Sequence, residues 1–163
     1  AKRQPERLRS QEEMHWPLDT LLHWNRAYGP RGFFQFQCLL DCTDANITLM
    51  QHLLAKFRPL GAGLAVLKVL GQEGCGWLSF PRPGLTLAVD LPVGSMQETA
   101  IRSANAIIHE REGRINLVKD ALLDAQTFHC MYPRAKELLE LRAALPKGWC
   151  PASLLSKRLG LNP

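Results

Sequence analysis

The sequence is poor in the features that assign a chain to a class at sight. No apolar run in its 163 residues approaches the roughly 20 that a membrane-spanning helix needs. The first residues, Ala-Lys-Arg-Gln-Pro-Glu-Arg, lack the apolar core of a signal peptide. The net charge is +5, which would help to attract an anionic ligand, but the basic residues form no block like that of a nucleic-acid-binding tail. We therefore expect no transmembrane segment and no basic tail within this chain.

Motifs for metals, disulfides and nucleophilic catalysis are missing as well. The five cysteines are an odd number and include no CxxC pair, so neither a disulfide framework nor a zinc site is predicted. We expect free thiols that are mostly buried. No Ser/His/Asp arrangement, HExxH or kinase motif stands out. The glycines of Gly61-Ala-Gly63 precede a strand-like run rather than a helix, which disfavours a phosphate-binding loop.

The apolar share of 46% and the length of 163 residues are typical of one globular domain with its own core. Residues 1–14 have no sustained apolar period and are expected to be a linker or arm. Periodicity predicts strands at 33–40, 64–70, 85–91 and 114–118. It predicts helices at 15–25, from Thr43 or Asp44 to 57, from a capping box at Ser95 to 112, and at 124–131, 134–145 and 153–159. This order is that of an α+β, ferredoxin-like or split βαβ fold, an antiparallel sheet with helices on one face and extra C-terminal helices.

The two faces of the predicted sheet differ in character. Residues Leu85, Leu87, Val89 and Leu91 form an unbroken apolar face, as alternation along a strand requires. The other face would carry these polar residues: Gln35, Gln37, Lys68, Thr86 and Asp90. Because apolar Leu64, Val66 and Leu70 share that face, we expect it to meet another domain rather than water. The loop 71–84 contains Trp77 and Phe80, so it could cover a site there.

Two lysines are candidates for a functional role. Lys68 lies inside an apolar run, where a charge is costly unless a partner, a cavity or a ligand receives it. The alternative is an ammonium group that reaches solvent at the sheet edge. Lys119 follows a strand and precedes Asp120, and its alternative is an ordinary exposed lysine. The residue patterns alone predict no more than an α+β domain whose polar sheet face is kept free for a partner or a ligand.

A set of segments, in this order along the chain, resembles the vanillyl-alcohol-oxidase-like flavoproteins. The similarity is to the C-terminal part of the oxidase subunits of decaprenylphosphoryl-ribose 2-epimerase, and sugar-lactone oxidases are further relatives. No single segment is decisive, but the ordered set covers nearly the whole chain from about residue 5. The segments are 17–29, 32–37, 66–71, 78–84, 87–92, Lys119-Asp120 and 127–134.

The resemblance implies that residues 15–163 form a substrate (cap) domain and that residues 1–14 lead from a flavin-binding domain of the same enzyme. FAD would be bound mainly by that domain, which is absent from this chain, so the chain alone would be inactive. The whole enzyme would oxidise a sugar or polyol alcohol by hydride transfer to the flavin. Either the cytoplasm or the cell envelope of a bacterium would suit it.

The resemblance also implies roles for particular residues. Lys119 would be catalytic, contacting substrate and flavin, and Lys68 would add positive charge near the reduced flavin or an anionic substrate. The substrate-binding positions would be Gln35, Gln37, Lys68, Thr86 and Asn116, with the glutamines holding sugar hydroxyls.

Departures from the family pattern imply a changed pocket. The family's cysteine falls at Ala88, its asparagine at Thr86 and its tyrosine at Asn116. Decaprenylphosphoryl-ribose is therefore not assigned as the substrate. The alternative function is a stand-alone ferredoxin-like module that binds nucleic acid or a protein partner. Binding of nucleic acid by such a sheet favours exposed aromatic side chains on the polar face, and Phe34 and Phe36 are predicted on the other, so no nucleic-acid partner is expected.

Overall fold

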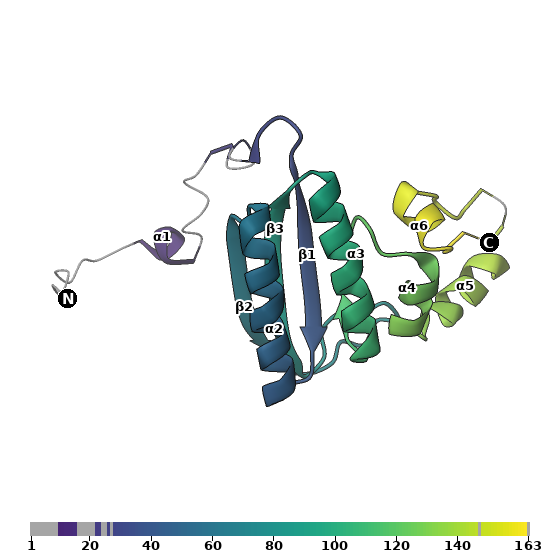
Figure 1. Cartoon of the computed structure of the whole chain (residues 1–163). Coiled ribbons are helices and arrows are strands. Elements are labelled where there is room, and N and C mark those ends of the chain that lie inside the picture. Colours follow the sequence, from purple (N-terminus) through teal and green to yellow (C-terminus); the bar gives the residue numbers. More distant parts are fainter. Residues whose placement is uncertain (1–9, 16–21, 24–25, 27, 147, 163) are drawn as a thin grey trace, which may run out of the picture.

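A computed structural model describes residues 10–15, 22–23, 26, 28–146 and 148–162. Its core is a four-stranded antiparallel sheet (Figure 1). The central elements, in chain order, are β1 (Phe33–Leu40), α2 (Asp44–Phe57), β2 (Leu64–Leu70), β3 (Gly84–Pro92), α3 (Ser95–Glu110) and β4 (Arg114–Ile115). The strand order is β2-β3-β1-β4, with every pair antiparallel. The predicted α+β fold and its split βαβ order are confirmed.

The strand register separates the two faces of the sheet as the alternation predicts. Side chains of paired residues point to the same side, and Phe36 pairs with Val89 and Cys38 with Leu87. These residues are buried beneath α2 and α3, where the ring of Phe36 meets that of Phe57 at 5.2 Å. Figure 1 shows both helices on this side of the sheet. The opposite side, which we call the open face, carries the glutamines of β1.

Strand β2 is an edge strand and is poorly covered on the helix side. Leu67 is 58% exposed and Val69 is 76% exposed, although both point to the side that the helices occupy. Helices α2 and α3 cover β3, β1 and β4 instead. The apolar residues of β2 are therefore exposed on both faces, which is unusual for an edge strand without a neighbour.

The two central helices begin differently from one another. Thr43 caps α2 by accepting a hydrogen bond from the amide of Asn46, as predicted. The capping box predicted at Ser95 is wrong, because the N-cap of α3 is Gly94 and Ser95 already lies in the first turn. Met96, in the first turn of this helix, is 68% exposed. Ser95 cannot cap once the extended backbone of Gly94 occupies the cap position.

Strand β4 is shorter than predicted. It ends at Ile115, and the amide of Asn116 still bonds to the carbonyl of Gln37 before the chain turns. The amide of Lys119 then bonds to the carbonyl of Asn116, so Lys119 lies in a turn rather than in a strand. Its two residues pair with Cys38 and Leu39 of β1.

Three helices follow the sheet, close to the predicted bounds. They are α4 (Ala125–Met131), α5 (Ala135–Ala144) and α6 (Leu154–Arg158), capped in the first and last cases by Asp124 and Ser153. Arg158 of α6 reaches back to the buried Asp120, with 2.8 Å between Nη1 and Oδ2. The last helix is thereby tied to the turn that carries Lys119.

The N-terminal part of the chain contains one described helix, α1 (Gln11–His15), which lies apart from the sheet in Figure 1. It falls within and just beyond the segment expected to be an arm. The helix predicted over 15–25 lies mostly outside the described residues. None of the helices in the described ranges has the length and apolar character to cross a membrane.

The cysteines of the chain are free, as expected. The expectation that they are mostly buried is wrong, because Cys42, Cys75 and Cys130 are exposed and Cys150 is half-buried. Only Cys38 is fully buried, and burial raises the pKa of its thiol to about 12. Its position on the core side of a central strand explains the difference.

Candidate functional site

The open face of the sheet holds a cavity of about 90 Å³ whose floor is built from three strands. Strand register fixes that floor: Gln35 and Leu64 flank Asp90, Gln37 and Val66 flank Ala88, and Lys68 lies beside Thr86. Lys119 enters from the turn after β4. The full lining is Gln35, Gln37, Leu64, Val66, Lys68, Thr86, Ala88, Asp90 and Lys119.

The residues that the sequence analysis assigned to a site are thus close together in the structure. Gln35, Gln37, Lys68, Thr86 and Lys119 all line this one cavity. Asn116 is not in the lining, but its side chain bonds to that of Gln37. The contribution of each residue to binding or catalysis stays a prediction.

A chain of hydrogen bonds crosses one side of the floor. The amide of Val118 donates to Asn116 Oδ1 at 3.1 Å, and Asn116 Nδ2 donates to Gln37 Oε1 at 2.9 Å. Gln37 Nε2 in turn donates to Thr86 Oγ1 at 3.0 Å. Both ends of the Gln37 amide are therefore held, and Thr86, which is 1% exposed, receives a hydrogen bond from the floor.

A buried carboxylate that the sequence analysis did not count as a site residue occupies the other side. Asp90 is 3% exposed and accepts hydrogen bonds from Gln35 Nε2 at 2.9 Å and from the hydroxyl of Tyr28 at 3.2 Å. Burial raises the pKa of Tyr28, and the charge of Asp90 and their hydrogen bond add to the shift. The signal for Asp90 was present, since it was placed on the polar face, whereas nothing in the sequence connected Tyr28 to it.

The two lysines give the cavity its positive charge. Lys68 extends from β2, and within the described residues neither Lys68 nor Lys119 has an ion pair or a side-chain hydrogen bond. Free ammonium groups beside a cavity can receive an anionic group from outside the chain. Ala88 lies at the centre of the floor, and its methyl group leaves more room than a larger side chain would.

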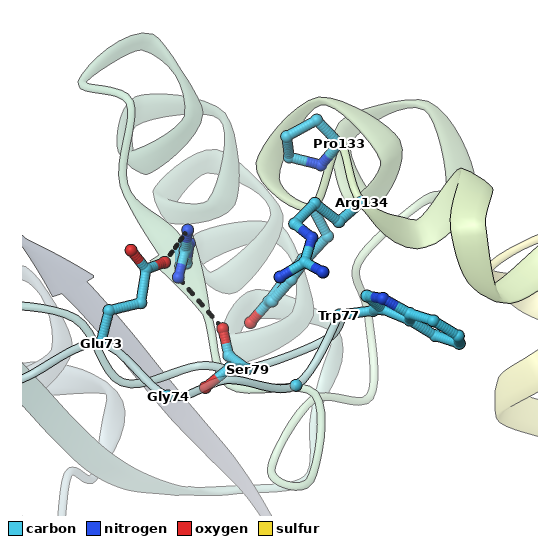
Figure 2. A pocket seen from close by; sticks show the side chains of 9 residues that line it. Glu73, Gly74, Trp77, Ser79, Pro133 and Arg134 are labelled. Carbon is cyan, nitrogen blue, oxygen red and sulfur yellow. Dashed lines mark hydrogen bonds and ion pairs between the residues drawn. The ribbon is translucent and has the colours of Figure 1, made fainter.

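A second, larger cavity of about 280 Å³ lies where the loop 71–84 meets the corner between α4 and α5. Arg114 anchors that loop: Nη2 pairs with Glu73 Oε1 at 2.8 Å and Nη1 donates to the Ser79 carbonyl at 3.1 Å. Figure 2 shows Glu73 and Ser79 on one wall and Pro133 and Arg134 on the other, with Trp77 beside them. Arg134 in turn pairs with Glu137.

The loop 71–84 therefore has a different place from the one that its aromatic residues suggested. It lines the second cavity, and none of its residues lines the cavity that holds Lys68. Each charged group that holds the loop already has an opposite charge inside the chain, as Glu73 and Arg114 do. We interpret the second cavity as a packing gap between this loop and the corner of α4 and α5, with a structural rather than a binding role.

No family model matches the chain. The chain is 32% identical over 151 residues to the decaprenylphosphoryl-beta-D-ribose oxidase of Mycolicibacterium smegmatis, a match that covers 91% of this chain and 32% of the oxidase. It is 31% identical over 135 residues to the uncharacterized protein in mprA 5′region of Streptomyces coelicolor, covering 80% of this chain and 36% of that protein. The chain spans about a third of the length of the curated relatives that it matches. It is distantly similar to the C-terminal region of an oxidase.

Proposed function

We propose that this chain is the substrate-binding part of an FAD-dependent oxidoreductase that oxidises an alcohol group of a sugar or polyol. Residues 15–163 form the substrate domain, and residues 1–14 connect it to a flavin-binding domain of the same enzyme. The observation that carries the proposal is the gathering of Gln35, Gln37, Thr86, Lys68 and Lys119 around one cavity of the open face. The similarity to an oxidase over most of the chain supports it.

The open face has the surface that docking of a second domain requires. Leu64, 46% exposed, lies on this face beside Val66 and Lys68. Leu64 and Val66 form an apolar rim along β2, next to the polar side chains of the cavity floor. Apolar side chains left uncovered around a polar cavity are typical of an interface. A flavin-binding domain placed over this face would remove the rim from water and close the cavity from above.

The side chains of the cavity suit the binding of an alcohol and the stabilisation of charge. Amide and hydroxyl groups of Gln35, Gln37 and Thr86 can orient substrate hydroxyls. The unpaired ammonium groups of Lys68 and Lys119 fit beside a flavin, whose bound ring would supply the hydride-accepting chemistry. In this proposal Lys119 contacts substrate and flavin, and both lysines stabilise negative charge as it develops.

The test uses the enzyme assembled with its flavin-binding domain. Bleaching of the oxidised flavin by a panel of sugars and polyols, followed under anaerobic conditions, reports the half-reaction. We expect Lys119→Ala to slow flavin reduction by at least about a hundredfold, as loss of a preorganised charge-stabilising group does, with little change in thermal stability. Lys56→Ala is the matched control, because Lys56 lies on α2 and bonds to Ser103 in the helix layer. Equal rates for Lys119→Ala and the parent would remove Lys119 from the site.

The separation of roles between the domains has its own measurement. The 163-residue chain, purified alone, should carry no stoichiometric flavin absorbance. A tightly bound flavin in that preparation would contradict the assignment of FAD to another domain. The nucleic-acid-binding alternative gains no support, because Phe34 and Phe36 are on the helix side, and Phe33, on the open face, stacks on Tyr28 at 4.7 Å.

A further inference from the structure

The hydrogen bonds beneath the cavity determine which of its groups remain free to donate and which to accept. A backbone amide can only donate, so the bond from Val118 requires that Asn116 presents Oδ1 to it. Asn116 must then donate from Nδ2 to Gln37, whose Oε1 accepts at 2.9 Å. The orientation of both amides is thus set by the backbone at Val118.

The same constraint reaches Thr86. With Oε1 bonded to Asn116, Gln37 can offer only Nε2 to Thr86, and Thr86 Oγ1 accepts at 3.0 Å. The hydroxyl hydrogen of Thr86 is then left over. Its neighbour in the register on one side is Lys68, which has no acceptor, and on the other side is the apolar Leu39. Within the described residues the Thr86 hydroxyl donates to no protein acceptor, so its hydrogen is available to the cavity.

The opposite end of the cavity has the reverse polarity. An ionised carboxylate can only accept, so Asp90 fixes Gln35 with Nε2 toward it and leaves Gln35 Oε1 as a free acceptor. Asp90 and Thr86 are four residues apart on β3, which separates their Cα atoms by about 13 Å at the usual rise of an antiparallel strand. Ala88 lies between them. A donor end at Thr86 and Lys68 therefore faces an acceptor end at Gln35 and Asp90.

We infer that this cavity binds a polyhydroxylated carboxylate of the aldonic acid class, with its carboxylate at Thr86 and Lys68 and its hydroxyls donating toward Gln35 and Asp90. The inference rests on the proposed function and deepens it by naming the substrate class. Thr86 is a specificity-determining residue, since its hydroxyl is presented as a donor. Asn116 is a positioning residue that acts through Gln37 and contacts no ligand.

The ligand class is tested on the 163-residue chain with two probes that differ at one end. D-gluconate carries a carboxylate where D-sorbitol carries a hydroxymethyl group, and the remaining carbons are the same. Titrations followed by the backbone amide resonances of the cavity residues give a Kd for each. We expect gluconate to bind at least about tenfold more tightly, the usual gain when a donor meets a charged acceptor. Equal Kd values would overturn the inference.

Variants at Thr86 connect that preference to its hydroxyl. Thr86→Val should weaken gluconate binding about tenfold and sorbitol binding little, whereas Thr86→Ser should retain the preference. Thr99→Val, at an exposed position of α3, is the matched control. A Thr86→Val variant that keeps the full preference for gluconate would overturn the assignment.

The orientation chain is tested by a double-mutant cycle with Asn116→Asp. An aspartate can still accept from Val118 but cannot donate, so Gln37 must turn Nε2 toward it and Oε1 toward Thr86. The Thr86 hydroxyl then donates to Gln37 and is lost to the ligand. Thr86→Val should therefore cost gluconate binding about tenfold in the Asn116 background but little in the Asn116→Asp background, and this comparison cancels the effect of the new charge. An equal cost in both backgrounds would overturn the role of Asn116.

These outcomes are distinguishable from a failure of the proposed function. If the cavity resonances shift with equal Kd for gluconate and sorbitol, the assignment of a carboxylate to Thr86 and Lys68 is refuted, but a polyol-binding site remains. If neither probe shifts the cavity resonances, the inference is overturned, and the flavin-reduction assay on the enzyme with its flavin-binding domain tests the proposed function separately. Flavin reduction by a neutral polyol but not by an aldonate, in the enzyme with its flavin-binding domain, would contradict the inference alone.

Discussion

The pair formed by Arg158 and Asp120 should contribute more to stability than any other ion pair among the described residues. The side chain of Asp120 is 2% exposed, and its partner in α6 reaches it across 38 residues of sequence. Arg158 also donates to the backbone carbonyls of Leu123 and Asp120. Replacing Arg158 by alanine leaves a buried carboxylate whose remaining donors, within the described part of the chain, are the amides of Leu122 and Leu123.

The loss of stability in Arg158→Ala depends on how well water can reach the carboxylate of Asp120 once the guanidinium is gone. Removing one partner of a fully buried ion pair costs about 3–5 kcal/mol. Arg158 itself is 29% exposed, so water can enter where the guanidinium was, and two amide donors remain for Asp120. We therefore expect Arg158→Ala to lower the free energy of unfolding by about 2 kcal/mol, nearer the range for single charged hydrogen bonds. For a domain of this length that corresponds to a decrease in Tm of about 4–8 °C.

Thermal and urea unfolding, followed by circular dichroism, measure the effect. Arg134→Ala is the matched control, because Arg134 forms a pair of similar geometry with Glu137 but both side chains are largely open to water, at 51% and 35% exposure. That variant should unfold at the parent's midpoint. Equal midpoints for Arg158→Ala and Arg134→Ala would refute the reasoning that burial of Asp120 decides the energy.

Three further outcomes follow from burial and close contact. Tyr28 and Tyr132 are the only tyrosines of the sequence, and burial raises the pKa of each, so tyrosinate absorbance should appear above the pH range of free tyrosine. A tyrosine pKa that is raised in the folded state means that stability is lost as the pH rises through it. Alkaline unfolding should therefore accompany the absorbance change. A thiol reagent should modify the exposed cysteines of the native chain but leave Cys38, with its pKa near 12, unmodified until unfolding. Gly74→Ala should destabilise the loop, because a Cβ there would overlap the Ser79 hydroxyl, whereas Gly76→Ala, with open space around it, should not.

The faces of the sheet were predictable because alternation is a local property of the sequence. Once Gln35 and Gln37 share a face of β1, a split βαβ order places them beside β3 and its Thr86. What joins the residues into one hydrogen-bonded chain was not predictable, since it depends on the register between strands far apart in the sequence. Tyr28 meets Asp90 across 62 residues, and no local pattern contains that contact.

The errors of prediction also have a physical cause. A Ser-x-x-Glu pattern is a capping signal, but the residue before it, Gly94, adopts the extended conformation of the N-cap and moves Ser95 into the helix. Lys119 was expected at the end of a strand, yet β4 stops at Ile115 and the chain turns, with the amide of Lys119 bonded to the carbonyl of Asn116. In both cases the neighbouring backbone, rather than the residue itself, decided the outcome.

If the cavity binds substrate as proposed, its arrangement allows the specificity to change while the fold remains. Ala88, Thr86 and Asp90 lie on β3, which is hydrogen-bonded on both sides, so their backbone positions are fixed by β1 and β2. Lys68 stands on an edge strand and Lys119 on a turn, where the backbone is held by fewer bonds. A substitution on β3 therefore alters the chemistry of the floor without moving it, and the two ammonium groups can adjust above it. Specificity of this kind depends on which side chains occupy β3 and on the hydrogen bonds that orient them.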